Sequence, residues 1–258
     1  MKTEISPSSA ILILQFLVGL GTSTSPLMIS LIGKNENWMY IPAIIFLVVA
    51  FFFLLFLFLK FEKESFFQLP EKIEIPKKLW IFFFAILLYG LIEGTLGSFG
   101  SIILKNKGLS NDLAALGLSL VWGGIAINRL LFGIFSRKMN LSLAFLFSPL
   151  LVGVFLFFLP NINSQNILLL SMFLIGFFMG TIFPGAIGWG TVEFGNLAVI
   201  VSGFLMAANQ IGIGIATNVL GNYEDHIAMI FRYLTIVCVF VFICFQMLKK
   251  DSKIDEAF

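Results

Sequence analysis

Apolar residues dominate this chain in long runs that short polar segments separate. Eight of the runs are near or above the length of about 20 residues that a helix needs to cross a bilayer. The pattern predicts an all-α, polytopic membrane bundle. We expect its transmembrane helices over residues 9–33, 39–59, 79–104, 112–135, 140–159, 167–194, 197–220 and 226–248.

The polar segments between these runs differ in their basic content. If successive helices alternate in direction, one side of the membrane holds eleven Lys and Arg residues, and the other holds only Lys34, Lys105 and Lys107. Basic loops tend to stay in the cytoplasm. We therefore expect both termini to be cytoplasmic.

The longest loop, 60–78, lies on the basic side and mixes both signs of charge. We interpret it as a cytoplasmic linker. It would separate the last two helices of an N-terminal bundle (1–59) from a six-helix C-terminal bundle (79–250), which a cytoplasmic tail (251–258) follows.

The composition sharpens the class. Hydrophobic residues make up 59% of the chain and charged residues 12%, whereas about a quarter of a soluble domain is charged. This excludes a water-soluble fold and makes the lipid bilayer the first partner, in a plasma membrane or a bacterial inner membrane. No basic patch is interleaved with aromatic residues, so we do not expect a nucleic-acid partner.

One acidic residue, Glu93, lies near the centre of the predicted helix 79–104, in LLYGLIEGTLGSFG (87–100). A carboxylate at this depth costs about 2.5–3.5 kcal/mol and therefore faces a cavity or a partner. On a helical period it shares a face with Tyr89, Gly90 and Gly97. Two interpretations stay open: a carboxylate that binds solute or protons along a pathway, or a structural glutamate that ties two helices together.

Two amides, Asn209 and Gln210, lie near the middle of the predicted helix 197–220, and Gln210 shares a face with small residues. They could bind a polar solute, or they could hydrogen-bond a neighbouring helix, as amides in membranes commonly do.

The segment GTIFPGAIGWG (180–190) is rich in glycine, and we expect a kink at Pro184 in the helix that contains it. Trp189 in this helix and Trp122 in 112–135 are candidate walls of a solute cavity. Close helix packing is the alternative interpretation for both tryptophans. Another glycine-rich stretch, GLGTSTSP (19–26), is interpreted as a packing face that ends at Pro26.

Three charged residues are expected on the cytoplasmic side of the bundle. Arg129 lies about 9 Å from the centre of its helix, and Glu193 and Arg137 lie near helix ends. We interpret them as a cytoplasmic gate that holds helices together in one state, with unlinked interfacial charges as the alternative.

Signatures of catalysis are absent from the sequence. There is no nucleophile elbow, no phosphate-binding loop and no metal-spaced His/Cys cluster, and His226 is the sole histidine. We therefore expect neither an enzyme nor a cofactor or metal site.

Several of these motifs together resemble the major facilitator superfamily of transporters. YGLIEGTLGSFG (89–100) and LVWGGIAINRLLFGIFSRKM (120–139) resemble its seventh and eighth helices, with the closest likeness to the sugar-transporter-like branch that includes fucose-permease relatives. GTIFPGAIGWG and VSGFLMAANQIGIGIATNVLG resemble the tenth and eleventh helices, and GLGTSTSP with NWMYIPAI resembles the fifth and sixth.

The resemblance implies secondary transport of a small polar solute, such as a sugar, by rocking of two six-helix halves about a midplane site. Proton coupling would be carried by Glu93. The eight predicted helices match helices five to twelve of that fold, so the first four would come from a longer product or an oligomer partner. A non-transporting sensor or scaffold, or an inactive fragment built on the same bundle, is the alternative.

Overall fold

The computed structural model describes residues 7–33, 40–58, 75–135, 141–250 and 252–257. These residues form helices joined by short turns, and no strand occurs among them. The helices are α1 (Pro7–Gly33), α2 (Tyr40–Phe58), α3 (Lys77–Asn106), α4 (Asn111–Phe135), α5 (Ser142–Phe158), α6 (Gln165–Met179), α7 (Ile182–Phe194), α8 (Ala198–Leu220), α9 (Ile227–Lys249) and α10 (Ile254–Ala257).

Six regions of the described chain are long and apolar enough to cross a membrane. One of them, Gln165–Tyr223, has 59 residues and contains two of the expected spans. The expected span 39–59 coincides with a shorter apolar helix, Tyr40–Leu55. The all-α polytopic membrane bundle is thus confirmed, and its elements follow the predicted order. The linker 60–78 lies outside the described residues up to position 74.

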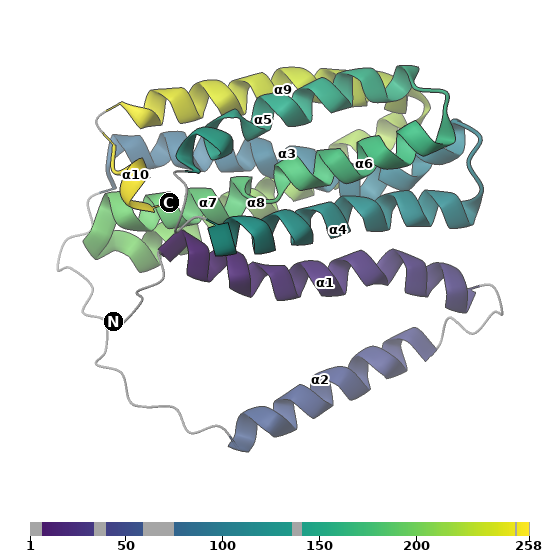
Figure 1. The fold of residues 1–258 in the computed structure, drawn as a ribbon, viewed down its shortest axis with the longest axis horizontal. Coiled ribbons are helices and arrows are strands. Elements are labelled where there is room, and N and C mark those ends of the chain that lie inside the picture. Colours follow the sequence, from purple (N-terminus) through teal and green to yellow (C-terminus); the bar gives the residue numbers. More distant parts are fainter. Residues whose placement is uncertain (1–6, 34–39, 59–74, 136–140, 251, 258) are drawn as a thin grey trace.

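The spanning helices lie side by side along the long axis of the molecule (Figure 1). Extensive contacts pair α3 with α8, α4 with α6, and α5 with α9, and α1 packs along α4 and touches α7. In this view α2 lies apart from the other helices, and most of its described side chains are exposed. The arrangement brings three helices, α1, α3 and α4, to one side of the bundle.

Glycines allow two of these pairs to approach closely. A Cβ atom added at Gly212 of α8 would lie 2.1 Å from the carbonyl oxygen of Leu87 in α3. One added at Gly176 of α6 would lie 1.9 Å from the carbonyl oxygen of Val121 in α4. Small residues that let helix backbones meet are typical of packing inside membranes. The α3–α8 contact fixes the height at which Glu93 faces α8.

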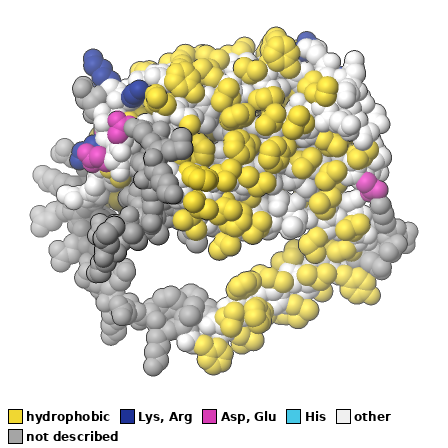
Figure 2. Space-filling view, in the orientation of Figure 1, with side chains coloured by type: hydrophobic (Ala, Val, Ile, Leu, Met, Phe, Trp, Pro, Cys, Tyr) yellow, Lys and Arg dark blue, Asp and Glu magenta, His cyan; other side chains and the backbone are white. Residues whose placement is uncertain are grey.

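The surface agrees with burial in a bilayer. Hydrophobic side chains cover the face seen in Figure 2, and the charged side chains visible there lie toward the two ends of the molecule. Phe84, Phe147 and Phe240, from three different helices, are each about half exposed. Exposed aromatic side chains in such a belt match the hydrocarbon core of a membrane. The chain is an integral, multi-pass membrane protein.

The predicted helix 167–194 is interrupted. Helix α6 ends at Met179, Gly180 and Thr181 form a turn, and α7 begins at Ile182. A helical residue at position 184 would donate its N–H to the carbonyl of Gly180, but proline has no N–H, and its ring crowds that carbonyl. The expected disturbance from Pro184 therefore occurs one turn earlier, at Gly180.

Candidate functional site

Helices α1, α3 and α4 line an open cavity of about 690 Å³. This volume falls in the range of about 300–1,000 Å³ that is common for small-molecule sites. The cavity opens toward the end of the bundle where α3 turns into α4. Its lining residues are Thr22, Ser25, Pro26, Ile29, Ser30, Ser101, Lys105, Asn111, Asp112, Ala115, Leu118 and Trp122.

Trp122 supplies the large aromatic wall of this cavity and is partly exposed to it. Gly97 of α3 lies beside the ring, and a Cβ at that position would be in ordinary van der Waals contact with the Trp122 Cζ2 atom, at 3.5 Å. Trp122 therefore lines a cavity, and its role as a wall for a bound solute stays a prediction. Its indole offers an apolar face that can pack against the C–H face of a ring-shaped solute.

Hydroxyl groups line the α1 side of the cavity. The hydroxyls of Thr22 and Ser25 donate to backbone carbonyls of their own helix, at 3.1 Å and 2.9 Å. Each retains lone pairs that can accept a hydrogen bond from a solute. The Ser30 hydroxyl donates to the Asp112 carboxylate across the cavity mouth, at 2.8 Å. The cavity therefore presents acceptors on α1 and a charged rim on α3 and α4.

This hydroxyl-lined wall was not predicted from the sequence. Residues 19–26 were interpreted as a packing face, and Gly19 does pack against Ala126, where an added Cβ would lie 2.8 Å from the alanine Cβ. Thr22, Ser25 and Ser30 turn toward the cavity instead. Ser25 and Ser30 follow Thr22 by three and eight residues, and this was a usable signal, because both spacings keep a hydroxyl near the side of the helix that carries Thr22.

A second polar feature joins α3 to α8. The side-chain amide of Asn209 donates a hydrogen bond of 3.1 Å to the Glu93 carboxylate. Asn209 is 5% exposed and Glu93 is partly exposed. The Arg129 guanidinium is also close enough to act on the Glu93 carboxylate electrostatically. The carboxylate thus meets a partner helix, as expected, and keeps part of its surface open.

Glu93 is connected to the cavity by a row of positions on α3. Glu93, Gly97, Ser101 and Lys105 follow one another at intervals of four residues, so each lies beside the next on the helix surface. Ser101 and Lys105 line the cavity, and Gly97 lies against Trp122. The row leads along α3 from the cavity lining to the carboxylate near the middle of the helix.

The structure separates the other predicted site residues from the cavity. Gln210 is exposed, and it points about 100° away from Asn209 around α8, so it does not share Asn209's contact with α3. Tyr89 is fully buried, and its ring is stacked on Phe183 at a centroid distance of 6.4 Å. Trp189 is fully buried in an aromatic cluster, with its ring centroid 4.8 Å from that of Phe82. The structure does not bring Trp189 to the cavity.

The charged residues of the expected gate have partners that the sequence did not reveal. Arg129 is 5% exposed. Its Nε donates to the Gly180 carbonyl at 3.1 Å, and its Nη1 donates to the backbone carbonyl and side-chain oxygen of Gln15, at 3.2 Å and 3.3 Å. Its hydrogen-bond partners thus lie on α1 and at the α6–α7 break, and Glu193 is not among them. Arg137 lies outside the described residues.

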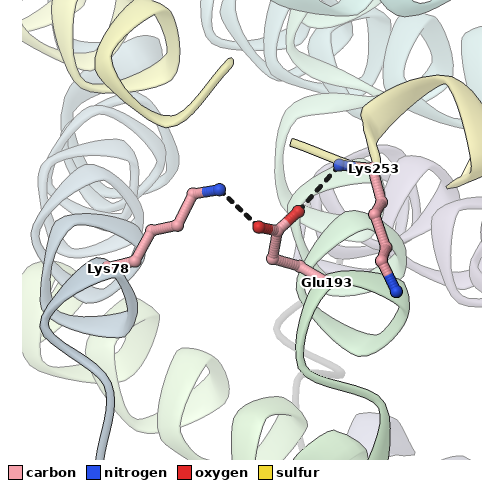
Figure 3. Close-up of polar contacts among 3 residues, drawn as sticks. All are labelled: Lys78, Glu193 and Lys253. Atoms are coloured by element: carbon pink, nitrogen blue, oxygen red, sulfur yellow. Dashed lines mark hydrogen bonds and ion pairs between the residues drawn. The ribbon is translucent and has the colours of Figure 1, made fainter. Parts of the chain in front are cut away.

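Glu193 connects three segments at one end of the bundle (Figure 3). Its carboxylate forms an ion pair with Lys78 at the start of α3. It also accepts a hydrogen bond of 2.9 Å from the backbone N–H of Lys253, just before α10. Ile254 and Ala257 of α10 are buried against the bundle. Glu193 therefore holds the end of α7 to α3 and to the C-terminal segment.

No group of three or more His, Cys, Asp or Glu side chains that could hold a metal ion occurs in the part of the chain that the structure describes.

Comparison with known proteins shows the family to which this chain belongs. The family model of the Major Facilitator Superfamily matches residues 7–217. The chain belongs to the major facilitator superfamily. It is also similar to the glucose/mannose transporter GlcP of Bacillus subtilis (strain 168), with 27% identity over 227 residues. The match covers 81% of this chain and 56% of the relative, so the chain spans about half of that protein's length.

Membership of the major facilitator superfamily gives the cavity a context. In this family the two halves are related by an axis along the membrane normal, and substrate sites lie near the midplane where the repeats meet. In this chain the cavity lies where α1 meets α3 and α4.

Proposed function

We propose that this chain carries out secondary transport of a small polar solute, and that the solute is a sugar of the hexose type. The observation that carries the proposal is the cavity of about 690 Å³ between α1, α3 and α4. Transport of a small solute agrees with the family, and the choice of a sugar rests on the chemistry of the lining and on the glucose/mannose transporter to which the chain is similar.

The lining suits a polyhydroxylated ring. The indole of Trp122 offers an apolar surface for the ring's C–H groups, and the hydroxyls of Thr22, Ser25 and Ser101 exchange hydrogen bonds with its hydroxyls. The charged groups, Lys105 and Asp112, lie at the rim. A neutral, polar solute fits this distribution better than an ion does, because charge is confined to the mouth.

Glu93 is the proposed link between solute and proton. It is the carboxylate that the α3 row reaches from the cavity, and Asn209 supplies one donor to it. A proton on Glu93 would remove its charge while leaving the other carboxyl oxygen able to accept from Asn209. We therefore propose proton symport through Glu93. Tyr89 on α3 and Gln210 on α8 are secondary candidates for residues of the solute or proton pathway.

The orientation and the division into bundles belong to the same proposal. Both termini would be cytoplasmic, with 1–59 and 79–250 as parts of two bundles, and with the Lys78–Glu193 ion pair at the cytoplasmic end. Glu93 is partly exposed, and Gln210 is exposed at membrane depth, where polar groups need partners. Helices outside these residues, from a longer product or from a second copy, would cover Glu93 and Gln210 and supply their partners.

Solute counterflow in proteoliposomes tests the proposal. The purified chain is reconstituted in vesicles preloaded with unlabelled glucose or mannose, and entry of the labelled sugar is followed. We expect transient accumulation above the level in empty vesicles, with competition by the other hexose. Absence of accumulation for both sugars and for a panel of polyols would contradict sugar transport.

The same preparation separates the transporter from a sensor or scaffold built on the bundle. A non-transporting protein that binds sugar would show a raised melting temperature with the sugar and no counterflow. A transporter shows both, because binding to the folded state stabilises it and the bound solute is released on the other side.

A further inference from the structure

The break between α6 and α7 leaves a backbone carbonyl without its helical donor. Gly180 lies four residues before Pro184, so the N–H that would bond to its carbonyl does not exist. The turn at this point is tight, with the Gly180 N–H bonded to the Phe177 carbonyl at 3.3 Å. The helix resumes with the Gly185 N–H bonded to the Thr181 carbonyl at 2.8 Å. At Gly180 the missing donor has a definite cause, the proline at position 184.

Arg129 of α4 donates to this same carbonyl. Its Nε lies 3.1 Å from the Gly180 oxygen. The residues around the contact leave little freedom for the turn, because a Cβ at Gly180 would lie 2.7 Å from the Asn128 Oδ1 atom and 2.8 Å from the Ile125 carbonyl oxygen. The guanidinium therefore supplies from another helix the donor that Pro184 lacks.

The other edge of the guanidinium reaches α1. Its Nη1 donates to both oxygens of Gln15, at 3.2 Å for the backbone and 3.3 Å for the side chain. One turn further along α1, Gly19 packs against Ala126 of α4. A planar guanidinium holds its donors in a fixed fork, so one rigid group links α1 to the break, in addition to the direct contact between α1 and α7.

We propose that Arg129 is a positioning residue that replaces the hydrogen bond lost at Pro184 and thereby couples the break in α6–α7 to helix α1. The break is then held closed only while α1 is docked, and a displacement of α1 is transmitted to α7. The bridge itself stands on the geometry alone. Its use in moving α7 during transport rests on the proposed function.

Position 184 offers a sharp test, since Pro184→Ala restores the N–H that Arg129 replaces. The full chain is purified in detergent, and backbone hydrogen exchange is measured in segments around Gln15, around Gly180 and in α9 as an internal reference. Arg129→Gln should raise exchange around Gln15 and around Gly180 and leave α9 unchanged. Arg129→Gln with Pro184→Ala should return the Gly180 segment to the wild-type rate, while the Gln15 segment stays fast.

A matched proline gives the control. Pro149 lies inside α5, and the hydrogen bonds of Arg129 do not involve that helix. Pro149→Ala should not correct either segment in the Arg129→Gln chain. If Arg129→Gln does not fold, Arg129→Lys is used in its place, because an ammonium keeps the charge but cannot reach both partners with a fixed fork.

Two results would overturn the proposal. One is exchange that rises equally in α9, which would mean general loosening of the bundle. The other is a Gly180 segment that Pro184→Ala fails to restore, or that Pro149→Ala restores as well. Counterflow by the doubly substituted chain is measured separately and should be lost while the fold is kept. If the wild-type chain shows no counterflow, the proposed function fails, and the exchange result still decides the bridge.

Discussion

The side-chain amide of Asn209 donates a hydrogen bond to the Glu93 carboxylate across the α3–α8 contact, at 3.1 Å. The contact is possible because Gly90 and Gly212 let the two backbones approach: a Cβ at Gly90 would lie 2.2 Å from the Asn209 carbonyl oxygen. The pair therefore has a structural part, which holds two helices together, and a chemical part, which is the carboxylate itself.

The two parts respond differently to substitution. Glu93→Gln keeps an oxygen that accepts from Asn209, so we expect a nearly unchanged free energy of unfolding and loss of solute-driven proton uptake. Asn209→Ala removes the donor and should destabilise the bundle by about 0.6 kcal/mol and by no more than about 1.7 kcal/mol, which are the mean and the maximum for hydrogen bonds between membrane helices. Unfolding in mixed micelles measures the free energy of unfolding, and the pH inside the vesicles measures proton uptake. Proton uptake that persists in Glu93→Gln would remove Glu93 from the coupling.

Glycine contacts predict a sharp contrast between two conservative substitutions. Gly176→Ala places a methyl group 1.9 Å from the Val121 carbonyl oxygen, so the α4–α6 pair must move apart. We expect a loss of about 1–3 kcal/mol, as for other overpacked interiors. Gly203→Ala meets nothing within 4 Å and should be neutral or slightly stabilising, because alanine favours a helix. Equal melting temperatures for the two variants would contradict the close contact of α4 and α6 at Gly176.

The positions of the helices could largely be predicted from the sequence, whereas the contacts between particular helices could not. Hydrophobic runs placed the helices, and glycine periodicity indicated that Glu93 faces a neighbour. It could not choose between Asn209 and Gln210, because adjacent helical residues point about 100° apart and the choice depends on which side of α8 meets α3. The Gly90–Gly212 approach decides it, and that approach is a tertiary property.

Charge led the sequence interpretation to join Arg129 with Glu193, and the structure gives each a different partner. Arg129 is drawn to the carbonyl that Pro184 leaves without a donor, and Glu193 to Lys78 and the Lys253 N–H. Pro184 was visible in the sequence, but its nearness to α4 was not. Trp189 likewise joined an aromatic cluster, with Phe82, Phe145 and Phe245 around it, whose members are far apart along the chain.

The Glu193 contacts predict unequal effects from removing the two partners of one ion pair. Glu193→Gln weakens both the Lys78 pair and the Lys253 contact, whereas Lys78→Met removes the Lys78 pair and keeps the Lys253 contact. Because the Lys78 side chain is 27% exposed, water and salt screen the pair, and Lys78→Met should have the smaller effect on the C-terminal segment. Glu193→Gln should make the segment 252–257 more susceptible to limited proteolysis. The reverse order of susceptibility would show that Glu193 does not hold this segment.

Protection of the cavity by its solute tests the central claim most directly. Ser101 lines the cavity, while Ser98 is exposed on α3 outside the lining, and the native Cys238 and Cys244 are buried. Ser101→Cys and Ser98→Cys are labelled with a thiol reagent in vesicles, with and without glucose or mannose. We expect the sugar to slow labelling at position 101 several-fold and to leave position 98 unchanged. Labelling at position 101 that no hexose slows would contradict the assignment of this cavity to the transported solute.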